Sequence, residues 1–360
     1  MPRHNLHNNL IFALTTYIFI VVCSSVFYNY MLFSRIDPSD FVEKLKQVEI
    51  GLSAKECNRR PLDGVCFDGQ LSPIFAVMID NHSAARPQAG VSEASLVYET
   101  IAEDPITRFM ALFYLNEAPE KIGPIRSARP FFIEWVKQYN VPYAHVGGSP
   151  DAMEILAKTY PFNLDEISNG QYFYRDETLE APHNAFTTPE KLKSAFEKKQ
   201  WDIKTPENVW KYSDTPVITS QVATNSIKID FGGANSKVEW KYDAKTQDYL
   251  RYSAGKIHRD ANGGEIRAKN VIVMRTESVI VDDYGRRDTT TIGSGAAKVF
   301  YRGAVIAGTW KRETLEQTTR FYQDNGEEIV LVPGTTWIEV VPTYLPDAVI
   351  DEPVRSPLLQ

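Results

Sequence analysis

Four stretches between residues 80 and 184 place polar side chains where a predicted strand or helix begins or ends. The first is Asp80-Asn81-His82, which directly follows an apolar run. If the strand continues, alternation puts Asp80 and His82 on the same face. A carboxylate beside an imidazole there suits a general base with its orienting partner, or a metal ion. The alternative is a simple turn, because Asp and Asn readily bond to the local backbone.

The second stretch, Gly123 to Pro130, contains Arg126 and Arg129 just before a predicted helix. Free N–H groups at a helix start favour an anion, so a cation there is unfavourable unless something anionic lies close by. We therefore predict that Arg126 and Arg129 grip a phosphate or carboxylate, near the basic Arg108. The alternative is a pair of internal salt bridges, for instance to Glu99 or Glu103.

The third stretch, His145 to Pro150, is typical of a strand, a glycine turn and a capped helix. Gly147 and Gly148 allow a ligand to approach the backbone, so we expect them and Ser149 to assist anion binding. The stretch lacks the Gly-Lys-Ser/Thr of a phosphate-binding loop and the Gly-x-Ser-x-Gly of a nucleophile elbow. Ser149 is therefore predicted to be a helix cap rather than a nucleophile.

The fourth stretch combines Asp176 with His183. Together with Asp80 and the earlier histidines, it completes the set of candidate catalytic residues, which is Asp80, His82, His145 and His183. In this interpretation His82 or His145 is the general base, and Asp80 or Asp176 orients it. The three histidines are scattered and lack ligand spacing, so we predict no metal and no cofactor.

Alternating strands and helices must position these residues. Residues 74–79 form a continuous apolar run that is typical of a buried strand. Two further strands are predicted at 94–99 and 109–114, and a short one at 143–146. Helices are predicted at 131–139, 151–160 and 189–199, the last capped by Thr188. We expect an α/β domain over residues 73–210.

From about residue 218 the pattern changes to short strands separated by glycine-rich turns such as Asn262-Gly263-Gly264. This spacing predicts a mainly antiparallel, β-rich domain over residues 218–345, followed by a tail at 346–360. The strands are predicted at 226–231, 238–242, 249–253, 270–275, 297–301, 319–322 and 337–341.

Residues 10–33 contain no charged side chain. As a helix they would rise about 36 Å, which is enough to cross a hydrocarbon core of about 30 Å. No small-x-small cleavage site follows, so an uncleaved transmembrane anchor is expected, with a tail at 1–9 and a stalk and linker at 34–72. The flanking charges leave the orientation open. The overall fold class is α+β: a membrane helix, an α/β layered-sandwich domain and a β-rich C-terminal domain.

The composition narrows the function classes. The chain has 360 residues, 43% of them hydrophobic, and a net charge of −7. A disordered protein is a poor match for this composition, and so is a general nucleic-acid binder, which would usually be basic. Outside the membrane segment the chain has only Cys57 and Cys66. One short disulfide loop would suit an exported domain, and two free thiols are the alternative.

The order of these motifs resembles the YerB-like family, a bacterial family of unknown function whose members include proteins named as lipoproteins. The resemblance covers about residues 72–345 and implies an extracytoplasmic protein with an N-terminal α/β layered sandwich and a β-rich C-terminal domain. It implies no reaction, and the plain transmembrane anchor departs from the lipoprotein members. The motifs that carry it are residues 75–82, 85–88, 106–111, 123–129, 144–149, 181–184, 268–273 and 308–312.

The sequence thus predicts a single-pass cell-membrane protein whose body is extracytoplasmic and binds an anionic envelope glycan or peptide. The predicted ligand-binding residues are Arg108, Arg126, Arg129, Gly147, Gly148 and Ser149. A hydrolase or transferase acting on envelope polymers is the first alternative, and it requires a histidine within hydrogen-bond reach of a carboxylate beside the arginines. A protein-interaction module is the second, and it requires a large exposed apolar patch. The oligomeric state is left open.

Overall fold

The computed structural model describes residues 57–207, 209–216 and 224–351. The described residues from Asn58 onward form one compact unit. The predicted membrane segment at 10–33 lies outside the described residues, as do the tail at 1–9 and the stalk up to residue 56. Within the described ranges, no helix has the length and apolarity that a bilayer crossing requires.

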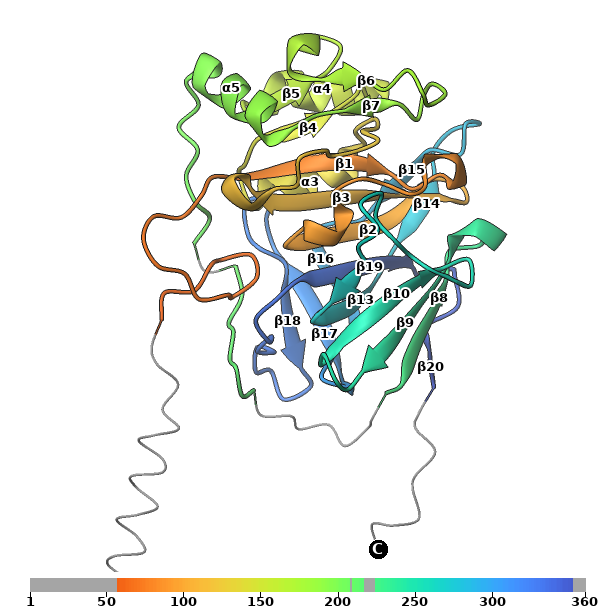
Figure 1. Ribbon diagram of the computed structural model, residues 1–360. Helices are drawn as coiled ribbons and strands as arrows, with labels where there is room; N and C mark the ends of the chain where they lie inside the picture. Colours follow the sequence, from red (N-terminus) through yellow and green to blue (C-terminus); the bar gives the residue numbers. More distant parts are fainter. Residues whose placement is uncertain (1–56, 208, 217–223, 352–360) are drawn as a thin grey trace, which may run out of the picture. The chain divides into compact units, whose positions relative to one another are not determined.

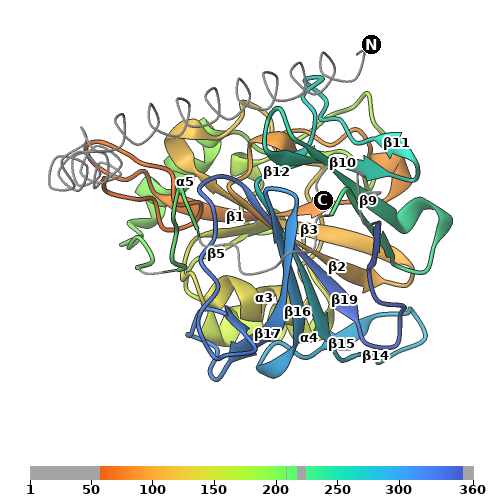
Figure 2. The same ribbon diagram turned by 90° about the horizontal axis from the view of Figure 1, so that it is seen from below.

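One large mixed sheet organises the unit that begins at Asn58 (Figures 1 and 2). Its strands β2, β3 and β1 pair antiparallel, whereas β1, β4 and β5 run parallel, as do β13, β19 and β2. In spatial order they are β18 (Arg320–Gln323), β17 (Ala304–Arg312), β16 (Gly293–Tyr301), β13 (Asn270–Thr276), β19 (Thr336–Pro342), β2 (Leu96–Glu103), β3 (Ile106–Tyr114), β1 (Ile74–Asp80), β4 (Tyr143–His145) and β5 (Asn163–Asp165).

Both faces of the central strands are covered, which explains why β1 reads as an unbroken apolar run. Every residue of β1 is buried. Alternate side chains enter two separate cores: Ala76 and Met78 join one, and Val77 and Ile79 join the other. The first core is completed by helices α3 (Pro130–Lys137) and α4 (Pro150–Thr159), and the second by α5 (Pro189–Lys199) and a smaller sheet.

The smaller sheet packs its apolar side chains, among them Trp240 and Tyr249, into the second core. All of its paired strands are antiparallel. Its path is β11 (Lys256–Ile257), β10 (Asp248–Ser253), β9 (Lys237–Asp243), β8 (Ser226–Asp230) and β20 (Val349–Asp351), with β12 (Arg267–Ala268) also pairing with β10. Two hairpins lie apart from both sheets: β6 (Tyr174–Arg175) with β7 (Ala185–Phe186), and β14 (Ser278–Ile280) with β15 (Arg287–Thr289).

The three helices begin where the sequence predicts. Each has proline in its first turn, and the side chains of Ser149 and Thr188 accept hydrogen bonds from the N–H groups of Ala152 and Lys191. Ser149 is therefore a helix cap, as expected.

The two predicted domains share strands of one sheet. Strand β19, from the C-terminal segment, pairs directly with β2 from the N-terminal segment, so residues 73–210 and 218–345 build one continuous sheet. The predicted tail at 346–360 contains β20, which pairs with β8. The end of the predicted linker also belongs to this unit, because Leu62 is fully buried in the first core. Short sequence windows carry no information on such long-range pairing.

Candidate functional site

Three chain segments meet at the carboxyl end of β1. The N–H of Asp80 donates to Pro124 O at 2.8 Å, and the N–H of Arg126 donates to Met78 O at 2.9 Å. On its other side, this segment receives the end of the β6–β7 hairpin, because Ile125 N–H donates to Ala185 O at 2.7 Å. The first, second and fourth polar stretches of the sequence are thereby brought together.

Asp80 is the centre of this group. Its side chain is almost completely buried, and its Oδ2 atom lies 2.6 Å from His183 Nδ1 and 3.1 Å from Arg126 Nε. Its Oδ1 atom accepts the N–H of His82 at 2.9 Å, which is the local turn bond expected of Asp. Both interpretations of Asp80-Asn81-His82 therefore apply: the carboxylate closes a turn and also binds a histidine.

The two histidines of this group stack on each other, with ring centroids 4.9 Å apart and an angle of 9° between planes. Ala84 N–H donates to His82 Nδ1, so the neutral His82 ring carries its proton on Nε2 and presents a donor there. His183 donates Nδ1–H to the Asp80 carboxylate, which leaves Nε2 as an acceptor. The side chain of His183 is 16% exposed. The pair thus offers one hydrogen-bond donor, at His82 Nε2, and one acceptor, at His183 Nε2.

Arg126 completes the group, and its guanidinium is only partly used. The side chain is 21% exposed, and its single ion pair within the described residues runs from Nε to Asp80. The Nε contact is an ion pair without hydrogen-bond geometry, and the two terminal nitrogens have no ion pair with any described residue. We refer to Asp80, His82, Arg126 and His183 as the β1-end cluster.

Arg108 and Arg129 are held inside the protein instead of facing a ligand. Both pair with the carboxylate of Glu103, and their side chains are 2% and 5% exposed. Their remaining contacts are to backbone carbonyls, for example Arg108 Nη1 to Ser127 O at 3.0 Å. Burial lowers the pKa of each to about 10, so both stay charged at neutral pH. The internal salt bridge that the sequence left open as an alternative for Arg126 and Arg129 forms at Arg129, and Arg108 shares its carboxylate partner.

Backbone groups of the glycine turn in the third stretch already bond to other residues of the protein. The N–H of Gly147 donates to Asp165 Oδ1 at 2.7 Å, and the N–H of Ser149 donates to Ala128 O at 3.4 Å. The carbonyl of Gly147 accepts from Ala128 N–H at 2.9 Å. The bonds to Ala128 hold the turn against the segment before α3, and this segment contains Arg126 and Arg129. Gly147, Gly148 and Ser149 remain predicted ligand-binding residues that the geometry does not favour.

His145 has a different environment from the other two histidines. It is fully buried, with Nδ1 2.8 Å from Gly147 O and Nε2 2.7 Å from Asn163 Oδ1. Burial lowers its pKa, so the ring is neutral. A ring with both nitrogens bonded and no exposed surface cannot exchange protons with a substrate, so His145 is a poor general base.

Asp176 also has its own partner. It pairs with Lys121 at 2.6 Å, and the hydrogen bond from Lys121 lowers the pKa of this carboxyl to about 2. The histidine–carboxylate pair that forms is therefore His183 with Asp80. Among the residues that the structure describes, no group of three or more His, Cys, Asp or Glu is arranged to hold a metal ion.

A second polar group, which sequence reasoning did not find, lies buried between the two sheets. Glu99 of β2 and Glu339 of β19 are direct partners on adjacent parallel strands, and both are fully buried. Arg251 of β10 reaches them from the smaller sheet, with Nη2 2.5 Å from Glu99 Oε2. Its guanidinium lies over the rings of Phe109 and Trp337, at 5.4 and 5.0 Å from their centroids.

Glu339 is a neutral acid in this group. Burial and the charge of Glu99 raise its pKa well above the usual range. Trp240 Nε1–H donates to its Oε1 at 2.8 Å, and its buried Oε2 meets no donor among the described residues. A proton on Oε2 resolves this, because it allows Glu339 to donate to Glu99. The signal in the sequence is a lone carboxylate inside an apolar strand, at Glu99 and again at Glu339.

Hydrogen bonds connect this buried group to the β1-end cluster. Asn81 donates from Nδ2 to Glu99 Oε1 at 3.1 Å, and Gln88 donates from Nε2 to Asp80 O at 2.9 Å. Gln88 Oε1 also accepts from the Nε2–H of His258 at 2.9 Å. The residues from 80 to 88 are thereby fixed from inside the protein, which makes Asp80 and His82 rigid.

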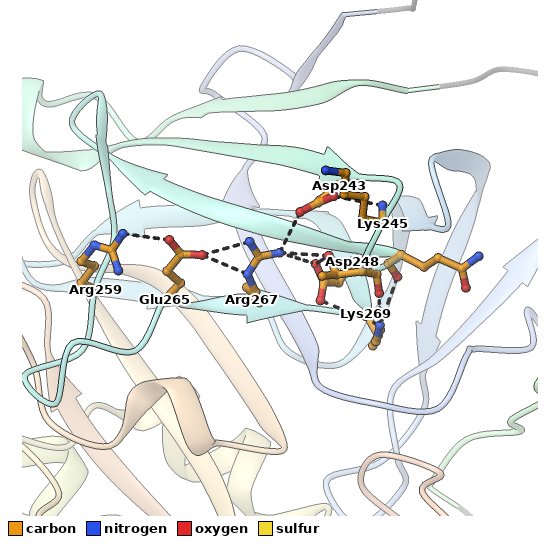
Figure 3. A network of polar contacts seen from close by, with 9 residues as sticks. Asp243, Lys245, Asp248, Arg259, Glu265, Arg267 and Lys269 are labelled. Carbon is orange, nitrogen blue, oxygen red and sulfur yellow. Dashed lines mark hydrogen bonds and ion pairs between the residues drawn. The ribbon is translucent and has the colours of Figure 1, made fainter.

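Two arginines at the surface of the smaller sheet have several partners. Arg267 on β12 contacts the carboxylates of Glu265, Asp248 and Asp243, and Arg259 also binds Glu265 (Figure 3). This network connects the turns of the smaller sheet. Arg126 differs from both, because its one ion pair with a described residue is that of Nε with Asp80.

Two further predicted features can be placed. Cys57 and Cys66 are both disulfide-bonded. The largest exposed apolar side chains include Val279, Ile280 and Tyr284 of the β14–β15 hairpin, which are 59%, 54% and 78% exposed. That surface is limited to one hairpin, so the interaction-module alternative stays a prediction.

Comparison with known proteins identifies the family. The model described as "Protein of unknown function (DUF3048) N-terminal domain" matches residues 67–202, and that of the C-terminal domain matches residues 227–338. The protein named "Putative lipoprotein YerB" from Bacillus subtilis (strain 168) is 32% identical over 334 residues, covering 90% of this chain and 95% of that protein. The crystal structure of YerB from Bacillus subtilis matches with a TM-score of 0.71 and 31% identity, covering 82% of this chain and 99% of that one. The chain therefore belongs to the DUF3048 family, whose members include YerB.

Proposed function

We propose that this chain is a membrane-anchored, extracytoplasmic protein that binds an anionic group of a cell-envelope polymer at the β1-end cluster. Three observations support the location. The apolar residues 10–33 provide an anchor. The disulfide cysteines suit an oxidising compartment. The relative from Bacillus subtilis carries a lipoprotein name.

The observation that carries the binding site is Arg126. A guanidinium that is partly exposed, fixed at Nε by a buried carboxylate and free at both terminal nitrogens is ready to accept a bidentate anion. The Nε2–H of His82 adds a second donor close by, through its stacking on His183. Because the charges of Asp80 and Glu103 are balanced by those of Arg108 and Arg129, an incoming anion would meet a net positive charge from Arg126.

The ligand would be a phosphate or carboxylate on a larger polymer. The site offers one guanidinium and two imidazoles in the described residues, which is enough to orient one anionic group but too little to recognise a small molecule by itself. Affinity for a polymer would therefore come from repeated anionic groups binding in turn.

The test compares Arg126→Gln with Arg175→Gln. Arg175 lies on the neighbouring β6 strand, is 40% exposed and already pairs with Glu166, so it is a matched control for surface charge. Binding of full-length protein to a phosphate-bearing polyol polymer is measured by co-sedimentation, with the dephosphorylated polymer as reference. Because charged hydrogen bonds contribute about 1.5–3 kcal/mol, Arg126→Gln should weaken binding at least about tenfold. Equal binding by Arg126→Gln and the wild type, or equal losses in both variants, would refute the assignment.

A further inference from the structure

We infer that the β1-end cluster is also an acid–base catalytic site, which hydrolyses a phosphodiester held by Arg126. This inference rests on the proposed function, because the substrate must first bind at Arg126. It goes further by giving separate roles to the two stacked histidines.

His183 has the properties of a general base. Its Nδ1–H donates to a buried carboxylate, which fixes the ring orientation and directs the Nε2 lone pair outward from Asp80. A negative partner on Nδ1 also stabilises the imidazolium that forms when Nε2 accepts a proton. Asp80 is therefore a positioning residue that acts through His183.

His82 has the complementary role. The N–H of Ala84 occupies its Nδ1 and fixes the tautomer that carries the proton on Nε2. Its ring lies parallel to that of His183, with centroids 4.9 Å apart, so a hydrogen-bond donor and a base are neighbours. Arg126 shares the Oδ2 atom of Asp80 with His183 and therefore lies beside the base.

The substrate class follows from how closely these groups are placed. A hydrogen-bond donor, a base and an anion-binding guanidinium this near to one another need a substrate whose charge and scissile bond are on the same atom. A phosphodiester meets this requirement. In a carboxylate-bearing glycan, by contrast, the glycosidic bond lies several bonds away from the charge.

The reaction balances with water as the only co-reactant. His183 Nε2 removes a proton from water as its oxygen forms a bond to phosphorus. The P–O bond to the leaving alcohol breaks, and the leaving oxygen takes up, through solvent, the proton that His183 removed from water. The Nε2–H of His82 donates a hydrogen bond to the reacting phosphate and keeps its proton. Arg126 binds the non-bridging oxygens throughout. The products are a phosphomonoester and an alcohol, and His183 is neutral again.

The experiment uses full-length protein in mild detergent with EDTA present, and two readouts. Hydrolysis of bis(p-nitrophenyl) phosphate is followed by release of p-nitrophenolate, and binding of inorganic phosphate is followed by calorimetry. Both wild type and Arg175→Gln should hydrolyse the probe. His183→Asn should lower kcat by about 10²–10⁴-fold while the phosphate Kd changes less than about twofold. Arg126→Gln should raise the phosphate Kd and KM at least about tenfold.

The outcomes separate the two proposals. If wild type binds phosphate but releases no p-nitrophenolate, or if folded His183→Asn keeps the full rate, the catalytic inference is wrong and the binding function stands. If wild type binds neither phosphate nor the phosphate-bearing polymer, the proposed function fails, and the catalytic inference fails with it. His82→Ala gives an independent check: it should lower kcat more than it raises the phosphate Kd, and an unchanged kcat contradicts its role as a hydrogen-bond donor in the reaction.

Discussion

Replacing Glu99 by Gln should destabilise the protein more than any single surface charge change. Arg251 is fully buried, and its ion pair with Glu99 Oε2 at 2.5 Å is the only salt bridge it forms with a described residue. Removing one member of a buried pair leaves an uncompensated charge and costs about 3–5 kcal/mol. The amide that Glu99→Gln introduces would also point an NH₂ group at the Arg251 guanidinium, whereas its oxygen could still accept from Asn81 and Thr107.

Glu339 explains why the stability loss of Glu99→Gln should lie at the lower end of about 3–5 kcal/mol. It lies beside Arg251 and is held neutral by burial and by the charge of Glu99. Once Glu99 is removed, Glu339 can ionise and take over as the counter-charge, so the single variant should lose about 3 kcal/mol. The double variant Glu99→Gln/Glu339→Gln has no carboxylate left, and its loss should exceed the sum of the two single losses.

Urea-induced unfolding of the full-length protein in mild detergent measures these differences, with Glu265→Gln as the control. Glu265 contacts two arginines at the surface (Figure 3), where an exposed pair contributes below about 1 kcal/mol. If Glu99→Gln and Glu265→Gln lose similar amounts, or if the double variant is merely additive, the account of the buried group is refuted.

The remaining predictions concern the buried acid, the sheet and the anion site. Burial raises the pKa of Glu339, so above the usual pKa of Glu the folded protein keeps a proton that the unfolded chain releases. This residue should therefore lower the free energy of unfolding by about 1.4 kcal/mol for each pH unit until the pH passes the raised pKa. Glu339→Gln should lack that slope when unfolding is measured across pH. Gly308→Ala should lower the free energy of unfolding by about 1–3 kcal/mol, because its Cβ would lie 2.0 Å from a backbone oxygen of β18. Gly170→Ala is the control: its Cβ would meet nothing within 4 Å, so thermal unfolding should show no loss of stability. Arg129→Gln should lower the melting temperature but leave phosphate affinity within about twofold of wild type, because this arginine is internal. A loss of affinity as large as that of Arg126→Gln would instead indicate that both arginines bind the anion.

The local elements could be predicted from the sequence because each has its own signals. The strand at 74–79, with its continuous apolar run, and the helix at 189–199, with its Thr188 cap, agree with β1 and α5 almost residue for residue. What could not be predicted is pairing between distant strands. Nothing within the windows around Leu96 and Thr336 indicates that these residues lie side by side, so a sheet shared by the N-terminal and C-terminal segments was not expected.

The candidate site was predictable in its members but not in its pairings. Asp80, His82, Arg126 and His183 all lie at element ends, where polar residues in apolar surroundings attract attention. The partner of Asp80 is 103 positions away along the chain, and the partner of Arg129 was one of several acidic residues within reach. Only the folded arrangement distinguishes an arginine with a free guanidinium from one that is closed by Glu103.

The most direct test of the central claim is a phosphate titration followed by the ¹⁵N resonances of the histidine side chains. Before phosphate is added, His82 should show a protonated Nε2 and His183 a protonated Nδ1. On addition, the resonances of both rings should shift, whereas the buried His145 and His258 should not, and Arg126→Gln should abolish the shifts. Shifts that persist in Arg126→Gln, or rings of His82 and His183 that do not respond while phosphate binds, would contradict an anion site at the end of β1.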